Sequence, residues 1–394
     1  MANTLWAFAK SATIDHPLFH MLLGGDVAPS VTPLVLQHID DFTLQELGNV
    51  AWCCSTLQLR RETVLDAVAS RSLRLLEDRQ RLNAGDELKG AHAIATSILC
   101  LVQAFTDLKM LEPLGSFESA LKHLAAEMDE LAGIVDTEIG AVSAEEGSGT
   151  LPAVLRENAH LQLLVKPPAW VVGGDTPGKA RSMAQWFQAR SSESIAWDAE
   201  ADFGFVHRLD RDTSGLLLRA KTYQGYFAAK FQFNTRQVRK QYLALCQGRF
   251  QKAPLMLDFP LRTQEIAPGI SRTFVDGKGQ ASLTEVCSVI HLRDFQDQAW
   301  SLLALRLHTG RTHQIRAHCS HLGHPLAGDE AYGGRSPTTC RVFLHACWLR
   351  INLGVPGAEW LLDEECPLLP DLEEVLKHLQ PESLADASAF RAAL

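Results

Sequence analysis

Apolar positions in the first 140 residues recur at the spacing of a helix. In one stretch this spacing is marked by Leu57, Val64, Leu65, Val68 and Leu75. Thr43 followed by Glu46 predicts a capping box that opens another helix. Pro and Gly are sparse outside residues 24–33. We therefore expect residues 1–140 to form an all-α region.

The same region contains weak internal similarity. Leu5-Trp6-Ala7-Phe8-Ala9 is similar to Ala51-Trp52-Cys53-Cys54-Ser55, 46 residues later, and residues 101–105 form a third copy without the Trp. A period in the forties is typical of stacked helical hairpins. The pattern weakly resembles the octotricopeptide-like repeats of organellar RNA-processing proteins. An irregular helical domain with Trp in its core explains it equally well, and a chain that begins inside a repeat also fits an N-terminally truncated product.

The pattern changes after residues 141–152, where small, polar and Gly residues predict a linker. Short runs typical of strands follow at residues 161–166, 215–218, 241–246, 283–289 and 300–307. Helical stretches intervene near residues 179–190 and 222–235. We expect residues 153–380 to form one α+β domain with a mixed, mainly antiparallel sheet, followed by a tail at residues 381–394.

Composition narrows the class of protein. With 394 residues, 46% hydrophobic and 21% charged, the chain is typical of two or three globular domains. No uncharged apolar stretch is long enough to predict a membrane span. The nine cysteines form no Cys-x-x-Cys pair, which argues against a zinc ribbon or a disulfide framework. The N-terminus has no signal or transit peptide pattern, so we expect an intracellular protein of the cytosol, nucleus or an organelle, or a chain without its targeting segment.

The net charge of −9 is unevenly distributed. Residues 1–145 carry a net charge of −10, residues 147–350 carry +9, and the remaining residues carry −8. The middle segment can therefore attract phosphates although the whole chain is acidic. Its Arg236, Arg239 and Lys240 are candidates for a phosphate track, although such residues more often form a solvated face.

A polar loop dense in charge precedes the apolar run after Gly215. It contains His207-Arg208-Leu209-Asp210-Arg211-Asp212-Thr213-Ser214. The cations around Asp210 would keep its carboxylate ionised, as a nucleophile or base requires. A structural ion-pair turn has the same composition, so this loop alone leaves both interpretations open.

A second segment runs from a strand through Thr309-Gly310 into a helix that we expect to open at Thr312. Arg316 then lies near the start of that helix, where it can reach a carboxylate from another loop. His313, His318, His321 and His324 lie close to Cys319, which suggests a zinc site. Their spacing matches no common zinc motif, so we expect no metal here.

Together these segments closely resemble the RluA-type family of RNA pseudouridine synthases. Four ordered motifs carry the resemblance: residues 207–215, Lys240-Gln241-Tyr242, residues 309–318 and residues 324–333. The similarity spans residues 158–378. It implies an isomerase that converts uridine to pseudouridine in structured RNA (tRNA, rRNA or mRNA), without a cofactor or metal.

The resemblance also implies roles for single residues. Asp210 corresponds to the catalytic aspartate, which acts at the ribose C1′ as nucleophile or base. Tyr242 corresponds to the tyrosine that stacks on the uracil and is a candidate acceptor of the C5 proton, and Arg316 to the basic partner of the aspartate. Arg208 corresponds to the arginine that enters the space left by a flipped nucleotide. The other substrate-binding candidates are His207, Arg311, Ile315 and Thr213, of which Ile315 packs against the base.

Two departures from the family pattern bear on the substrate. Trp170 and Gly173 are unusual in the segment after Lys166-Pro167, and no S4-like RNA-binding domain is visible. An acidic helical region stands in its place, which suggests a protein-interaction module. We expect no membrane contact, because no apolar stretch is long enough to span a membrane. A catalytically idle RNA-binding or assembly protein is the alternative to an enzyme. The presence of Asp210, Tyr242 and Arg316 together argues against it.

Overall fold

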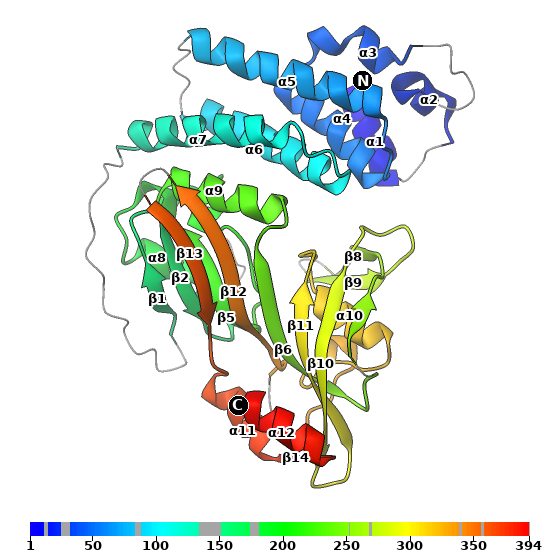
Figure 1. Cartoon of the computed structure of the whole chain (residues 1–394), viewed down its shortest axis with the longest axis vertical. Coiled ribbons are helices and arrows are strands. Elements are labelled where there is room, and N and C mark those ends of the chain that lie inside the picture. Colours follow the sequence, from blue (N-terminus) through cyan, green and yellow to red (C-terminus); the bar gives the residue numbers. More distant parts are fainter. Residues whose placement is uncertain are drawn as a thin grey trace. The chain divides into compact units, whose positions relative to one another are not determined.

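The computed structural model describes residues 1–11, 15–24, 32–82, 88–133, 151–173, 181–251, 253–267, 270–338, 341–355 and 358–393. The chain divides into a helical unit, residues 1–137 with 222–237, and a sheet unit, residues 138–221 with 238–394 (Figure 1). Most of the predicted linker, residues 141–150, lies outside the described residues.

The helical unit confirms the all-α prediction for its described residues. Its helices are α1 (Ala2–Ser11), α2 (Pro17–Leu23), α3 (Leu34–Gln37), α4 (Leu44–Thr56), α5 (Glu62–Leu82), α6 (Leu88–Asp107), α7 (Leu114–Leu131) and α9 (Tyr223–Asn234), with a short 3-10 turn, η1 (Ile39–Asp41). The predicted capping box opens α4, because the Thr43 hydroxyl accepts the backbone N–H of Glu46 and the Glu46 carboxylate accepts that of Thr43.

The two Trp-containing copies of the expected repeat fall in α1 and α4, which pack together. The Trp6 and Trp52 ring centroids are 6.4 Å apart. Helix α6 carries the third copy and packs on α4, α7 and α9. By length and composition α6 is apolar enough to cross a membrane, but half of its most apolar window is buried inside the protein, as in a core helix. The octotricopeptide-like assignment stays a prediction.

Helix α9 belongs to the helical unit although it comes from far along the chain. Its first three N–H groups have acceptors, because the buried Asp129 of α7 accepts those of Tyr223 and Gln224 and Thr222 accepts that of Gly225. At the other end Asn234 donates to the Leu99 carbonyl of α6. The helical unit is therefore built from two separate parts of the sequence, whereas the predicted domains were continuous.

The sheet unit contains a large mixed sheet in the order β1-β2-β5-β12-β6-β11-β10-β14, with β13 beside β12 and β7 beside β10. Its strands are β1 (Ala153–Glu157), β2 (Leu161–Lys166), β5 (Ser214–Ala220), β6 (Arg239–Gln247), β7 (Leu255–Leu257), β10 (Thr284–Asp294), β11 (Ala299–Leu307), β12 (Leu344–Val355), β13 (Ala358–Glu365) and β14 (Leu379–Pro381). Smaller sheets pair β3 (Trp170–Val171) with β4 (Arg181–Ser182) and β8 (Leu261–Ala267) with β9 (Ile270–Val275).

The main sheet is antiparallel except where β5 meets β12 in parallel. The α+β fold class is therefore confirmed. Gly215 makes the parallel contact possible, since a Cβ there would lie 2.2 Å from the Ala346 carbonyl oxygen. Each predicted strand falls at least partly within an observed one.

Short helices of the sheet unit are α8 (Met183–Gln188), α10 (Gln314–His321), α11 (Pro370–Lys377) and α12 (Leu384–Ala393), with 3-10 turns η2 (Ser194–Trp197), η3 (Asp202–Gly204) and η4 (Glu330–Tyr332). Helix α10 begins two residues later than expected. His313, before its first residue, has a left-handed φ of 52° and cannot continue a helix. The prediction of a start at Thr312 is therefore wrong.

Candidate active site

The loop that carries Asp210 is held against β5 by its own residues. The His207 Nε2 accepts the backbone N–H of Leu218 at 3.0 Å, and the Thr213 N–H donates to the Asp210 carbonyl at 3.1 Å. Leu209 is buried in the core of the sheet unit. These contacts leave the Asp210 side chain 23% exposed, so it can meet a ligand.

The buried Lys166 and the partly buried Arg341 hold the backbone that follows Asp210. The Lys166 ammonium, at the end of β2, donates to the carbonyls of Pro167, Trp170 and Arg211. Burial, followed by the positive charge of Arg341, lowers the pKa of Lys166 to about 7. The Arg341 guanidinium donates to the Asp212 carbonyl at 2.9 Å and to the Ser214 hydroxyl at 2.8 Å. The loop is therefore fixed from both sides.

Arg316 joins Asp210 to a second carboxylate. Its Nη1 donates to Asp210 Oδ2 at 3.2 Å, and its Nε and Nη2 donate to the two oxygens of Asp329 at 2.7 and 2.8 Å. Burial alone would lower the pKa of Arg316. The hydrogen bonds and negative charges of Asp329 and Asp210 outweigh burial, so the pKa of Arg316 is raised. The guanidinium is thus a permanent cation whose orientation Asp329 sets.

Gln314 explains why Arg316 has this position. Its side-chain oxygen accepts from the Thr309 hydroxyl and the Arg311 N–H, and its amide nitrogen donates to the Leu283 carbonyl and the Thr284 hydroxyl. The buried amide therefore fixes the turn between β11 and α10. Arg316 lies two residues further along the helix.

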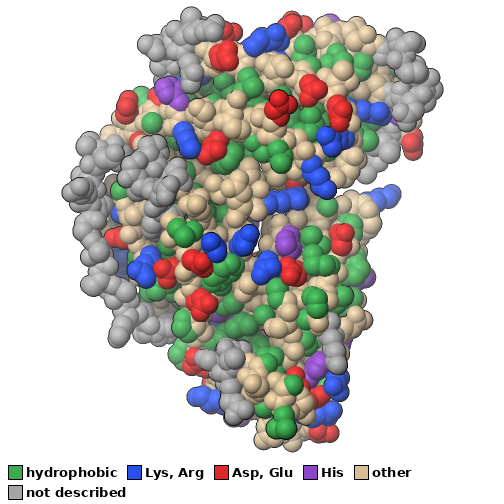
Figure 2. Space-filling model, in the orientation of Figure 1, with side chains coloured by type: hydrophobic (Ala, Val, Ile, Leu, Met, Phe, Trp, Pro, Cys, Tyr) green, Lys and Arg blue, Asp and Glu red, His purple; other side chains and the backbone are tan. Residues whose placement is uncertain are grey.

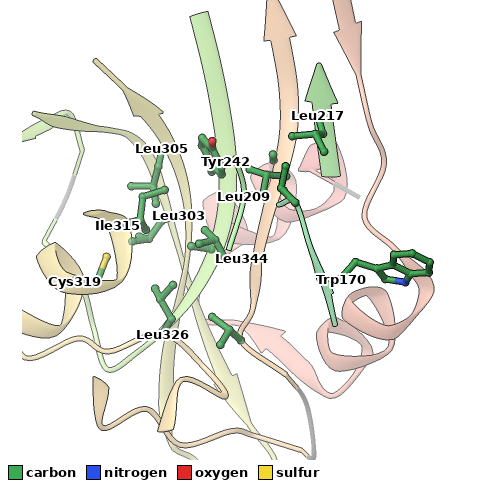
Figure 3. Packing of buried hydrophobic residues seen from close by; sticks show 14 of the residues in the cluster. Trp170, Leu209, Leu217, Tyr242, Leu303, Leu305, Ile315, Cys319, Leu326 and Leu344 are labelled. Atoms are coloured by element: carbon green, nitrogen blue, oxygen red, sulfur yellow. The ribbon is translucent and has the colours of Figure 1, made fainter. Parts of the chain in front are cut away.

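Tyr242 lies on β6 opposite Leu305 of β11, and its ring belongs to the main core cluster. Burial, followed by the negative charge of Asp210, raises the pKa of its hydroxyl above the ordinary value of 10.0, so the phenol is neutral at neutral pH. Ile315 belongs to the same cluster. Figure 3 shows it on α10 with Cys319, directed toward β11, the strand that carries Leu303 and Leu305.

The remaining candidates for binding substrate or phosphate have other surroundings and partners. Arg208 is exposed, and the Arg311 Nε donates to the Ala281 carbonyl. Arg236 pairs with Asp107 inside the helical unit, while burial lowers the pKa of Lys240 to about 8. On the face drawn in Figure 2, Lys and Arg side chains lie dispersed among Asp and Glu. The phosphate track stays a prediction.

Within the described ranges no group of three or more His, Cys, Asp or Glu side chains could hold a metal ion. His318 has other partners. Its Nδ1 lies 3.0 Å from the Thr284 hydroxyl, and its Nε2 lies 3.0 Å from the Phe259 carbonyl oxygen. The zinc interpretation of this histidine-rich segment has no support in the described part of the chain.

Sequence reasoning did not connect two further residues with Asp210: it left Asp329 out and weighed His313 only as a zinc ligand. Asp329 stands in the Gly-Asp pair of the last motif, and His313 in the Thr-Gly-Arg-x-His-Gln motif. The His313 Nε2 lies 3.9 Å from Asp210 Oδ2. Both residues were visible as motif members, but their contacts depend on how three loops meet.

Comparisons with known proteins identify relatives of the sheet unit. A family model described as RNA pseudouridylate synthase matches residues 160–321. Ribosomal large subunit pseudouridine synthase D of Nitrosomonas europaea is 34% identical over 237 residues, 58% of this chain and 65% of that protein. Ribosomal large subunit pseudouridine synthase C of Vibrio vulnificus is 32% identical over 235 residues, 58% of this chain and 69% of that protein. The match thus spans just under two thirds of the first relative.

Among solved structures, Human RNA Pseudouridylate Synthase Domain Containing 1 is 25% identical with a TM-score of 0.43. The alignment covers 64% of this chain and 98% of that one. The matched family region, residues 160–321, contains Asp210, Tyr242 and Arg316 but ends before Asp329.

Replacing Asp329 by Ala tests its role in holding Arg316. The fully buried carboxylate is lost, and the guanidinium, 12% exposed, keeps only Asp210 as a carboxylate partner. We expect the free energy of unfolding of the sheet unit to fall by about 3–5 kcal/mol, measured by urea denaturation. Arg156→Ala, which breaks a surface pair with Glu364, should cost less than about 1 kcal/mol. Equal effects of the two substitutions would show that Asp329 has no special structural role.

Proposed function

The chain belongs to the RluA-type RNA pseudouridine synthase family, and we propose that it converts uridine to pseudouridine in structured RNA. The observation that carries this proposal is the partly exposed Asp210 carboxylate paired with Arg316 at 3.2 Å. A fixed cation beside a carboxylate orients the carboxylate through a charge-assisted hydrogen bond. A carboxylate that attacks a substrate, or takes a proton from it, needs such a fixed cationic partner.

The isomerisation proceeds at Asp210 in this proposal. The carboxylate acts at the ribose C1′, as nucleophile or base, while the bond from C1′ to N1 of uracil breaks. The uracil turns and rejoins C1′ through C5. A base stacked in a helix cannot present both atoms, so the nucleotide leaves the stack first. In this proposal the exposed Arg208, two residues before Asp210, enters the gap.

Tyr242 and Ile315 supply the apolar side of the base pocket in this proposal. Both belong to the core cluster of the sheet unit, and aromatic side chains stack on unpaired bases in RNA-binding sites. His207 and Thr213 act through the loop, because their contacts hold the backbone on either side of Asp210. Arg311 is the remaining candidate for a phosphate contact.

Ribosomal RNA is the first candidate substrate. The two relatives described above are named ribosomal large subunit synthases. The net charge of +9 between residues 147 and 350 favours a polyanionic partner of this kind. Transfer RNA and messenger RNA are the alternative substrates.

Asp210→Asn tests the proposed chemistry with little change in shape. We expect the full chain to form pseudouridine in at least one of three RNAs, namely large-subunit rRNA, tRNA and an mRNA transcript, each mapped by mass spectrometry. The variant should lose at least about 1,000-fold in rate, because an amide is neither nucleophile nor base. Asp297→Asn, on the exposed surface, should match the unsubstituted chain. Product from Asp210→Asn at the normal rate, or none from the unsubstituted chain with any of the RNAs, would contradict the proposal.

We also propose that the N-terminal part of the helical unit, residues 1–133, contacts a protein rather than RNA. Residues 1–145 carry a net charge of −10, which repels phosphates. Deleting this region would also uncover the face of α9 that packs on α6 and α7, so an intact chain is the better material. In the full chain crosslinked by ultraviolet light to rRNA containing 4-thiouridine, we expect crosslinked peptides only from residues 151–393. Crosslinks at residues 1–133 would contradict the proposal.

A further inference from the structure

His313 faces Asp210 from the turn before α10. Its Nε2 lies 3.9 Å from Asp210 Oδ2, and both side chains are about one fifth exposed, at 21% and 23%. The backbone of His313 has a φ of 52°, a left-handed conformation that is strained for a non-glycine residue. A strained backbone beside a reactive carboxylate suggests that the ring serves the reaction.

Hydrogen bonds fix which nitrogen of His313 carries the proton. The Tyr332 hydroxyl accepts the N–H of Thr273 at 2.9 Å and donates its single hydrogen to the Thr273 carbonyl at 3.1 Å. His313 Nδ1, 3.1 Å from that hydroxyl oxygen, must then donate to it. This is the arrangement in which all these groups are satisfied. The lone pair of Nε2 therefore points to the Asp210 side.

Tyr332 is itself held rigidly. The guanidinium carbons of Arg272 and Arg316 each lie 4.9 Å from its ring centroid, in cation–π geometry. The hairpin of β8 and β9 and helix α10 thus both fix the tyrosine that orients His313. A merely solvated histidine would not need this support.

The proposed reaction contains a proton transfer that needs an acceptor. Once C5 has joined C1′, its hydrogen must leave for the uracil to regain its double bond. Tyr242 is a poor acceptor, because burial and the charge of Asp210 raise the pKa of its hydroxyl and keep it neutral. Asp210 is already engaged at C1′ during the same reaction. A second base close to Asp210 would separate the two tasks.

We propose that Nε2 of His313 accepts the C5 proton after the uracil has rejoined the ribose, an inference that rests on the proposed function. The C5–H bond breaks, its electron pair restores the C5–C6 double bond, and the proton passes to Nε2. The imidazolium then returns a proton to N1 of the same ring, directly or through solvent. No proton is gained or lost overall, as an isomerisation requires.

The surroundings of His313 keep its ring neutral, so that the ring can accept a proton. Burial lowers the pKa of His313 below its ordinary value of 6.5, and the positive charges of Arg316 and Arg208 lower it further, while Asp210 and Asp329 raise it. Tyr332 and, beyond it, Arg272 complete its polar surroundings. The ring is therefore neutral at pH 7. The rate should fall as the pH drops below 6.5 and His313 becomes protonated.

Removing the ring and supplying imidazole separately tests this role. Glycine accepts the left-handed φ at position 313, so His313→Gly leaves a hole without new backbone strain. On large-subunit rRNA transcribed with uridine or [5-²H]uridine, we expect a loss of roughly 100-fold or more in the variant. Its C5 deuterium isotope effect should exceed that of the unsubstituted chain, and added imidazole should restore much of the rate.

Two further variants complete the test. His313→Asn keeps a donor at the position of Nδ1 and accepts the left-handed φ, but it lacks a basic nitrogen. It should be as slow as His313→Gly, and its rate should no longer fall at low pH through protonation at position 313. His308→Ala, which removes a surface histidine paired with Glu285, should retain the normal rate and show no response to imidazole.

Three results would overturn the inference. His313→Gly could keep a rate within about twofold of normal. It could slow without a larger isotope effect or any imidazole response, which would make His313 a purely structural residue. Tyr242→Phe, rather than His313→Gly, could show the larger isotope effect. If the unsubstituted chain made no pseudouridine in rRNA, tRNA or mRNA, the proposed function itself would fail, and this inference with it.

Discussion

The site depends on one guanidinium shared by two carboxylates. Asp329 is fully buried and holds Arg316 by two short hydrogen bonds, and Arg316 in turn holds the partly exposed Asp210 by one. A buried carboxylate without its cation is costly. The same pair therefore stabilises the fold and fixes the direction of the third contact. Because Asp210 and Asp329 come from two loops and Arg316 from helix α10, this cation sets where the three segments meet.

The sheet supplies the loops at the right places. Gly215 lets β5 approach β12 closely, and the loop before β5 is then held by Lys166 and Arg341 through its backbone carbonyls. Strand β6 brings Tyr242 next to β11, which leads into the turn fixed by Gln314. In that turn, His313 lies 3.9 Å from Asp210, and Tyr332 in turn contacts the His313 ring.

Much of this arrangement follows from local sequence, and some of it does not. Strand positions were predictable because alternation and turn residues act locally. The position of Arg316 early in a helix indicated that it could reach a carboxylate from another loop, and the family resemblance implied that this carboxylate is Asp210. The bidentate role of Asp329 did not, because a separation along the chain says nothing of which oxygen faces which nitrogen. The left-handed φ of His313 and the return of α9 to the helical unit depend on packing between distant segments, which no local pattern encodes.

The most direct test of the central claim is the rate of pseudouridine formation in large-subunit rRNA by Arg316→Lys. Lysine keeps the positive charge but has a single nitrogen, which cannot bind both oxygens of Asp329 and also reach Asp210. If the shared guanidinium sets the site, the variant should be slower by roughly 100-fold or more and retain its affinity for the RNA. A variant as fast as the unsubstituted chain would show that charge alone suffices and would contradict this account.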